Sequence, residues 1–79
     1  MPRRVTSAAI AERLCGTPGV QGIHDLRTRK MGDLIVADVH LEVAADLTVR
    51  QGHDIAVEAR RRVVTDLPVL DVLTHVDPV

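Results

Sequence analysis

Residues 34–43 read LIVADVHLEV, and apolar and polar side chains alternate along most of this stretch. Successive side chains of a β-strand point to opposite faces of the sheet, so the pattern predicts a strand with one buried and one polar face. The buried face would carry Ile35, Ala37, Val39, Leu41 and Val43, and the polar face would carry Asp38, His40 and Glu42. This is the clearest strand in the chain, and the flanking segments are interpreted from it.

A helix and an earlier strand precede it. Alanines and two aliphatic residues favour a helix over about residues 5–15, with Thr6 or Ser7 as its N-cap and Gly16 at its end. The only cysteine, Cys15, is expected to be a small buried apolar residue at the end of this helix.

The next segment predicts the partner of the central strand. Residues 20–30 are expected to form a strand, and residues 31–33 (MGD) are typical of a hairpin connection to the strand at 34–43. Arg27, Arg29 and Lys30 are interpreted as the polar end of this strand.

A second helix and a last strand follow. Thr48 and Gln51 match a capping box, in which each side chain satisfies a free backbone amide of the other residue. The helix is expected to run to about Asp66 and to stop before Pro68, and residues 69–76 are expected to form the final strand. The apolar stripe of this helix is predicted to comprise Val49, Gly52, Ala56, Ala59 and Val63, with Ile55 beside it.

The order helix–strand–strand–helix–strand predicts an α+β fold in a single domain over residues 1–79. The economical arrangement is a three-stranded sheet with both helices on one face. The other face would then lack a cover within the chain. Since a domain of this size is only marginally stable alone, we expect a second subunit or a bound metal to stabilise it.

Composition excludes several classes of function. The net charge is −1 and aromatic residues are absent, which argues against a basic nucleic-acid binder and against base-stacking platforms. One cysteine excludes an internal disulfide and a CxxC motif. No nucleophile–base pair or glycine-rich phosphate loop is present, so the chain is not expected to be an enzyme. The run Arg60-Arg61-Arg62 is interpreted as a solvated helix face that also complements the helix C-terminus.

The four histidines are the candidate ligands. His24, His40 and His75 fall on three different predicted strands, and Asp77 shares a face with His75 because it lies two residues further along. Imidazole and carboxylate suit zinc or a similar divalent ion. His53 lies on the helix over the covered face, from which it would reach only a site in a second subunit. Spacing alone leaves open that all four are ordinary surface histidines.

Four strings together resemble the cytoplasmic C-terminal domain of cation diffusion facilitator (cation efflux) transporters. They are GVQGIHDLRTR at residues 19–29, DVHLEV at 38–43, QGH at 51–53 and THVDP at 74–78. The resemblance covers nearly the whole chain, and the four strings occur in the family's order. The hairpin string RTRKMGD and the final THVDP look most similar to members of the magnetosome membrane.

The resemblance implies a metallochaperone-like (ferredoxin-like) αββαβ fold and a homodimer beneath the membrane domain of the same transporter. It implies that His24, His40, His53, His75 and Asp77 are metal ligands, with Asp77 bridging and His53 supplied by the partner subunit. The implied ion is divalent, zinc or iron.

The resemblance also implies a place at the cytoplasmic face of a bacterial membrane, the magnetosome membrane by the narrower resemblance. Because the chain lacks the family's membrane domain, we expect a soluble regulatory fragment that binds related transporter or magnetosome proteins. The alternative is a constitutive dimerisation or protein-docking module that needs no metal.

Overall fold

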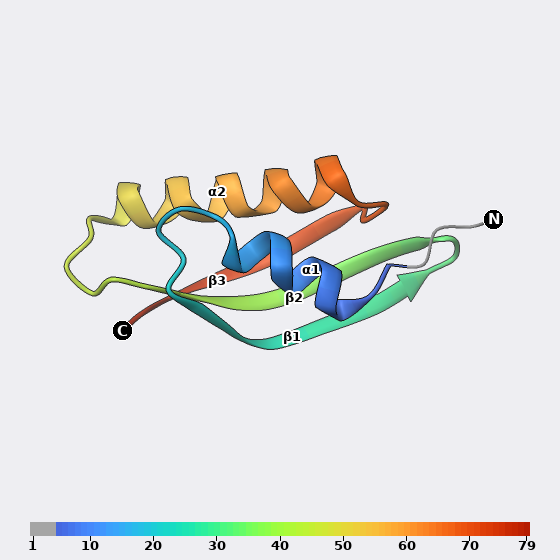
Figure 1. The fold of residues 1–79 in the computed structure, drawn as a ribbon, viewed down its shortest axis with the longest axis horizontal. Coiled ribbons are helices and arrows are strands. Elements are labelled where there is room, and N and C mark those ends of the chain that lie inside the picture. The colour runs from blue at the N-terminus through green and yellow to red at the C-terminus, as the bar shows by residue number, and fades with distance from the viewer. Residues whose placement is uncertain (1–4) are drawn as a thin grey trace.

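A computed structural model describes residues 5–79 and has the expected αββαβ order (Figure 1). The elements are α1 (Ser7–Cys15), β1 (Gly22–Met31), β2 (Leu34–Val43), α2 (Val49–Asp66) and β3 (Asp71–Pro78). The sheet order is β1-β2-β3, with β1 antiparallel and β3 parallel to β2. Both helices lie on one side of the sheet, which confirms the predicted architecture.

The helix ends follow the local signals in the sequence. The Thr6 side chain caps α1 by accepting from the Ala9 amide at 3.1 Å. The capping box of α2 is complete, because the Thr48 hydroxyl accepts from the Gln51 amide and the Gln51 side chain accepts from the Thr48 amide. At the other end Leu67 is extended, as expected for a residue before proline, and α2 stops there.

The core lies between β2 and the two helices. Alternate residues of β2 are almost fully buried, and side chains of α1 and α2 pack over them. The buried apolar residues are Ile10, Leu14, Ala37, Val39, Leu41, Val43, Ala56, Ala59, Val63, Val69 and Val72. Since β2 is the central strand, its apolar parity determines which face of the sheet the helices cover.

A β-bulge in β1 was not expected from the sequence. The register shifts between His24 and Arg27, so that two residues of β1 lie opposite one residue of β2. Asp25 takes the left-handed conformation there, with φ of 52°. The extra residue shifts by one position the alternation of side chains between the two faces of the sheet. Ile23 and Leu26 therefore both pack against the core, while His24 and Arg27 both lie on the opposite face.

Three expectations about single elements were wrong. Val49 is 92% exposed, because the first turn of α2 lies over a groove rather than over packed core. Cys15 is exposed, because Ile10 and Leu14 take the inward side of α1 and the next residue turns outward. The final strand runs from residue 71 to 78, two residues later than expected.

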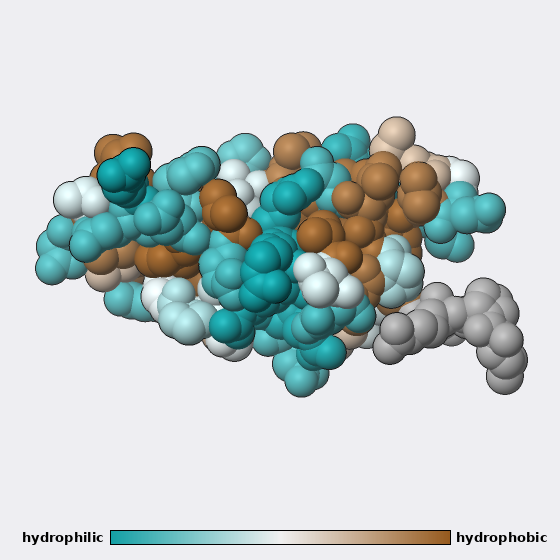
Figure 2. Space-filling model, turned by 90° about the horizontal axis from the view of Figure 1, so that it is seen from above, coloured by the Kyte–Doolittle hydropathy of each residue, from teal (hydrophilic) through white to brown (hydrophobic). Residues whose placement is uncertain are grey.

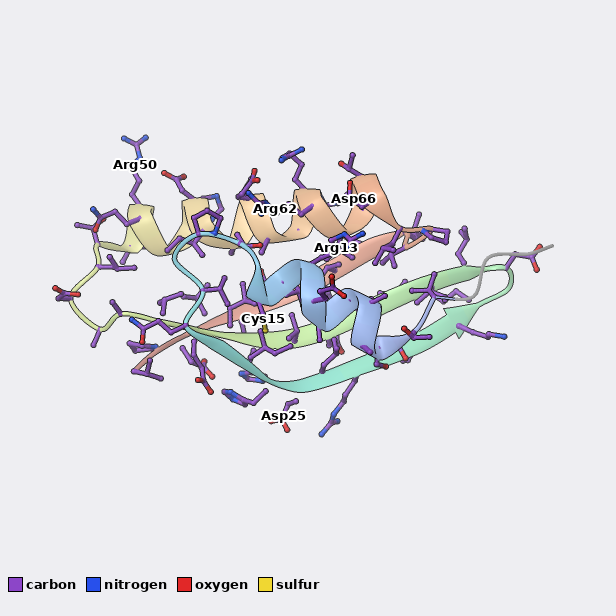
Figure 3. The ribbon with its side chains drawn as sticks, viewed as in Figure 1. Arg13, Cys15, Asp25, Arg50, Arg62 and Asp66 are labelled. Carbon is purple, nitrogen blue, oxygen red and sulfur yellow. The ribbon has the colours of Figure 1, made fainter. Side chains whose placement is uncertain are left out.

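The arginine run contacts α1, β3 and its own helix. Arg60 Nε donates to Asp71 at 2.6 Å, and Arg61 and Arg62 both donate to Glu58. Arg62 also donates to the Gly16 carbonyl at the end of α1. The last turn of α2 holds no basic residue, so the run does not complement the helix C-terminus. Figure 3 shows Arg62 on α2 above Arg13 of α1.

Candidate metal centre

The face of the sheet away from the helices, here called the open face, carries three of the four histidines in one row. His24 of β1 pairs with His40 of β2, which pairs with His75 of β3. Their rings stack across the strands, with centroids 4.8 Å apart for His24 and His40 and 4.7 Å apart for His40 and His75. In Figure 3 this face is the lower side of the sheet, where Asp25 projects away from the helices.

Asp77 occupies the next row and contacts two of the rings. Its Oδ2 lies 3.2 Å from His24 Nε2 and 3.0 Å from His40 Nδ1. His24, His40 and Asp77 each offer a ligand atom, and these atoms all lie within 4.8 Å of one another. Two ligands at about 2.0–2.1 Å from a tetrahedral zinc ion are about 3.3 Å apart. The two nitrogen–oxygen distances are close to this value, so these side chains could approach a common ion with small movements.

Glu42 completes the surroundings of His24. Its Oε2 lies 2.9 Å from His24 Nδ1, so the ring has a carboxylate at each nitrogen. A carboxylate only accepts hydrogen bonds, so a neutral His24 ring can donate to only one of the two carboxylates, and its other nitrogen is left to bind a cation. Glu42 was expected on the polar face of its strand but was not among the predicted site residues. Its position two residues after His40 was the available signal.

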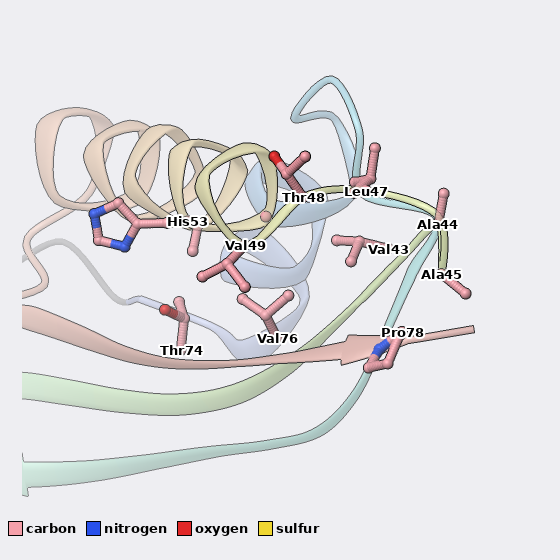
Figure 4. Close-up of a pocket in the computed structure, with 12 residues that line it drawn as sticks. Val43, Ala44, Ala45, Leu47, Thr48, Val49, His53, Thr74, Val76 and Pro78 are labelled. Carbon is pink, nitrogen blue, oxygen red and sulfur yellow. The ribbon is translucent and has the colours of Figure 1, made fainter.

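His75 and His53 stand outside the group of three. His75 is exposed and stacks on His40. His53 lies on α2, on the covered side of the sheet, near Thr74 and Val76, which alternate with His75 and Asp77 along β3 (Figure 4). The structure thus brings together four of the five implied ligands on one face and leaves His53 on the other.

Two hollows flank these residues. One of about 230 Å³ lies on the open face, beside His40 and His75, and is also lined by Asp25, Arg27 and Asp38. The other, of about 370 Å³, is mostly apolar. It lies between β3 and the first turns of α2. Figure 4 shows aliphatic side chains around it and His53 on its wall.

The family model described as "cation efflux protein, cytoplasmic domain" matches residues 2–79. The chain belongs to this family. Among curated relatives, the cation-efflux pump FieF of Cronobacter sakazakii is 39% identical over 70 residues, covering 89% of this chain and 23% of the pump. FieF of Pectobacterium carotovorum is 38% identical over 71 residues, 90% of this chain and 24% of the pump. The chain spans about a quarter of these relatives.

Solved structures of the MamM C-terminal domain have the same fold. A double variant superposes with a TM-score of 0.87 and 26% identity, covering 91% of this chain and 88% of that one. A cadmium form of another variant gives a TM-score of 0.84 and 28% identity, covering 89% of this chain and 88% of that one. A nickel form gives a TM-score of 0.84 and 27% identity, covering 89% of this chain and 90% of that one.

Within residues 5–79, every helix is too short or too polar to span a membrane.

Proposed function

We propose that this domain senses divalent metal ions and dimerises in response, and so regulates the cation efflux transporter to which it belongs. The observation that carries the proposal is the convergence of His24, His40 and Asp77 from three different strands. The side chains that make these contacts are about one-third exposed or more, so the contacts add little to the stability of the fold. A ligand role explains their arrangement better than a structural one.

Each implied ligand has a distinct part in the proposal. His24 and His40 supply ring nitrogens, and Asp77 lies between them. Both contacts to Asp77 use Oδ2, and its second carboxylate oxygen would allow Asp77 to act as the bridging ligand. His53 faces away from this site in its own chain and would act as a ligand only to a partner subunit. A bound ion would supply bonds between residues of two subunits, which favours the dimer by mass action.

The ion is proposed to be zinc or iron. The family's relatives are named cation-efflux pumps, and MamM structures exist in cadmium and nickel forms, which supports a divalent cation. The strings at 27–33 and 74–78 resemble the magnetosome-membrane member MamB, and on this resemblance we propose that the parent transporter lies in that membrane. This domain would then lie at its cytoplasmic face, as a homodimer in contact with its own membrane domain.

Calorimetric titration tests the proposal. The parent chain, His40→Ala and Asp77→Ala are titrated with zinc, and with ferrous iron under argon. We expect saturable binding in the parent and its loss in both variants. Asp54→Ala, which removes an exposed carboxylate from α2, is the matched control and should bind as the parent does. Absent binding, or binding that both substitutions leave unchanged, would contradict metal sensing.

The pH dependence gives a second check on the histidine ligands. Imidazole binds a metal only when neutral, so zinc affinity should fall below about pH 6. Undiminished affinity at about pH 5 would contradict the assignment of His24, His40 and His75.

A constitutive docking module is the second candidate. It is favoured by the apolar groove beside β3 and by exposed aliphatic side chains such as Leu70. Viewed from above the helices, hydrophobic side chains gather toward the end where α2 finishes (Figure 2). Analytical ultracentrifugation separates the candidates, because the module predicts the same dimer with EDTA and with zinc, whereas metal sensing predicts tighter association with zinc.

A further inference from the structure

Glu42 and Gly22 form an unusual pair on the open face. They are opposite each other in the register, one row beyond His24 and His40. Asp77 is the third member of this row, on β3. A row of three side chains would be expected, but Gly22 contributes none. Glu42 therefore has room to lean toward β1, where its Oε2 reaches His24 Nδ1 at 2.9 Å.

The space above Gly22 is already used by Glu42. A Cβ atom built on Gly22 would lie 2.8 Å from Glu42 Oε1, closer than real Cβ contacts allow. Gly22 has no positive φ, so backbone conformation does not demand glycine here. What demands it is the position of the Glu42 carboxylate.

We propose that Glu42 is a positioning residue that orients the His24 ring for metal binding, and that Gly22 is required because it leaves room for Glu42. In this arrangement Nδ1–H donates to Glu42, and Nε2 is presented toward Asp77 as the ligand atom. Metal-binding histidines commonly donate their other ring N–H to a carboxylate, which fixes tautomer and orientation. The inference rests on the proposed metal site and adds a residue outside its ligands.

His24 and His40 consequently differ in the nitrogen that each offers. His24 faces Asp77 through Nε2, whereas His40 faces the same oxygen through Nδ1. Only His24 has a second carboxylate holding its other nitrogen among the described residues. Loss of Glu42 should therefore disturb His24 and leave His40 in place.

Zinc affinity measured by calorimetry is the first test. Glu42→Ala should weaken binding by about 10–100-fold, the usual cost of losing such a partner. Glu42→Gln should retain most of the affinity, since the amide oxygen still accepts from Nδ1–H. Asp38→Asn is the matched control for charge, because it removes a carboxylate from the same face of β2, on the other side of His40. Asp38→Asn should bind zinc as the parent does. A loss in Glu42→Gln as large as that in Glu42→Ala, or a loss of that size in Asp38→Asn, would overturn the inference in favour of general charge.

Gly22→Ala separates position from charge. It keeps the carboxylate but displaces it, and the displaced atoms are the flexible end of a side chain, so the fold should survive. We expect a loss of affinity similar to that of Glu42→Ala and little further loss in the double variant, because both changes break one contact. Additive losses, or no loss in Gly22→Ala, would overturn the role of Gly22.

Long-range proton–nitrogen NMR of the metal-free chain tests the ring itself. At a pH where His24 is neutral, we expect its proton on Nδ1 in the parent and a shift toward Nε2 in Glu42→Ala, with His40 unchanged. A parent ring protonated on Nε2 overturns the positioning inference, whatever the zinc result. A parent that orients His24 as stated but binds no zinc overturns the proposed function instead.

Discussion

The two faces of β2 differ in burial and in the kind of contact that their side chains make. On the covered face of β2, Ala37, Val39 and Leu41 are 0% exposed and pack beneath the helices. On the open face, the side chains of Asp38, His40 and Glu42 are 32–34% exposed and contact other polar groups. The covered face supplies stability through burial. The open face is free to hold ligands, because its contacts contribute little to the fold.

The largest effect should come from breaking the covered face. Leu41→Ala removes a fully buried side chain and should lower the free energy of unfolding by about 2–5 kcal/mol. His40→Ala, the adjacent residue on the open face, should change it by less than about 0.5 kcal/mol without metal. Urea unfolding in EDTA measures both. Similar losses in the two variants would contradict the contrast between the faces.

Zinc should stabilise the domain through the ligands of the open face. At about 100 times the dissociation constant, a ligand that binds only the folded state adds about 2.7 kcal/mol. We expect this increment in the parent and its loss in Asp77→Asn. Thermal unfolding with and without zinc provides the measurement, and an equal increment in Asp77→Asn would move the metal away from the open face.

The bulge in β1 determines which residues of that strand face each side of the sheet, and substitutions at Asp25 test its importance. The left-handed conformation of Asp25 is tolerated by aspartate and costly for a β-branched residue. Asp25→Val should lose about 1–2 kcal/mol of stability, whereas Asp25→Gly should lose little. Chemical unfolding of the two variants compares them. Equal stability would show that the bulge does not constrain this residue.

The smallest effect is expected at Glu58, on the surface of α2 and away from both sheet faces. Hydrogen bonds from Arg61 and then Arg62 lower the pKa of Glu58 from 4.5 to about 2. The folded state therefore binds fewer protons than the unfolded state between these values, and stability rises with pH there. The contribution of Glu58 is complete above about pH 4.5 and is lost as the pH falls toward about 2.

The unfolding free energy of the parent and Glu58→Gln, measured from acidic to neutral pH, checks this expectation. Their difference should be largest near neutral pH and shrink in acid, and added salt should reduce it because the pair is exposed. A difference that does not vary with pH would contradict the lowered pKa.

The sequence alone determined the elements whose signals are local. The alternation in 34–43 placed β2 to the residue, and the capping box at Thr48 placed the start of α2. Pro68 placed its end. Such signals act over one strand period or one helical turn, so a short window of sequence contains them. They also predicted that His40 and Glu42 face away from the core.

Only the tertiary structure decided what lies next to what. Pairing between strands put His24, His40 and His75 in one row, and the bulge at Asp25 kept His24 on the open face with Arg27. Packing left Val49 and Cys15 outside the core, contrary to expectation. The contact of Glu42 with His24 depends on the register with Gly22, which lies on another strand and far away along the chain. Register is set by many weak contacts acting together, and no short pattern encodes it.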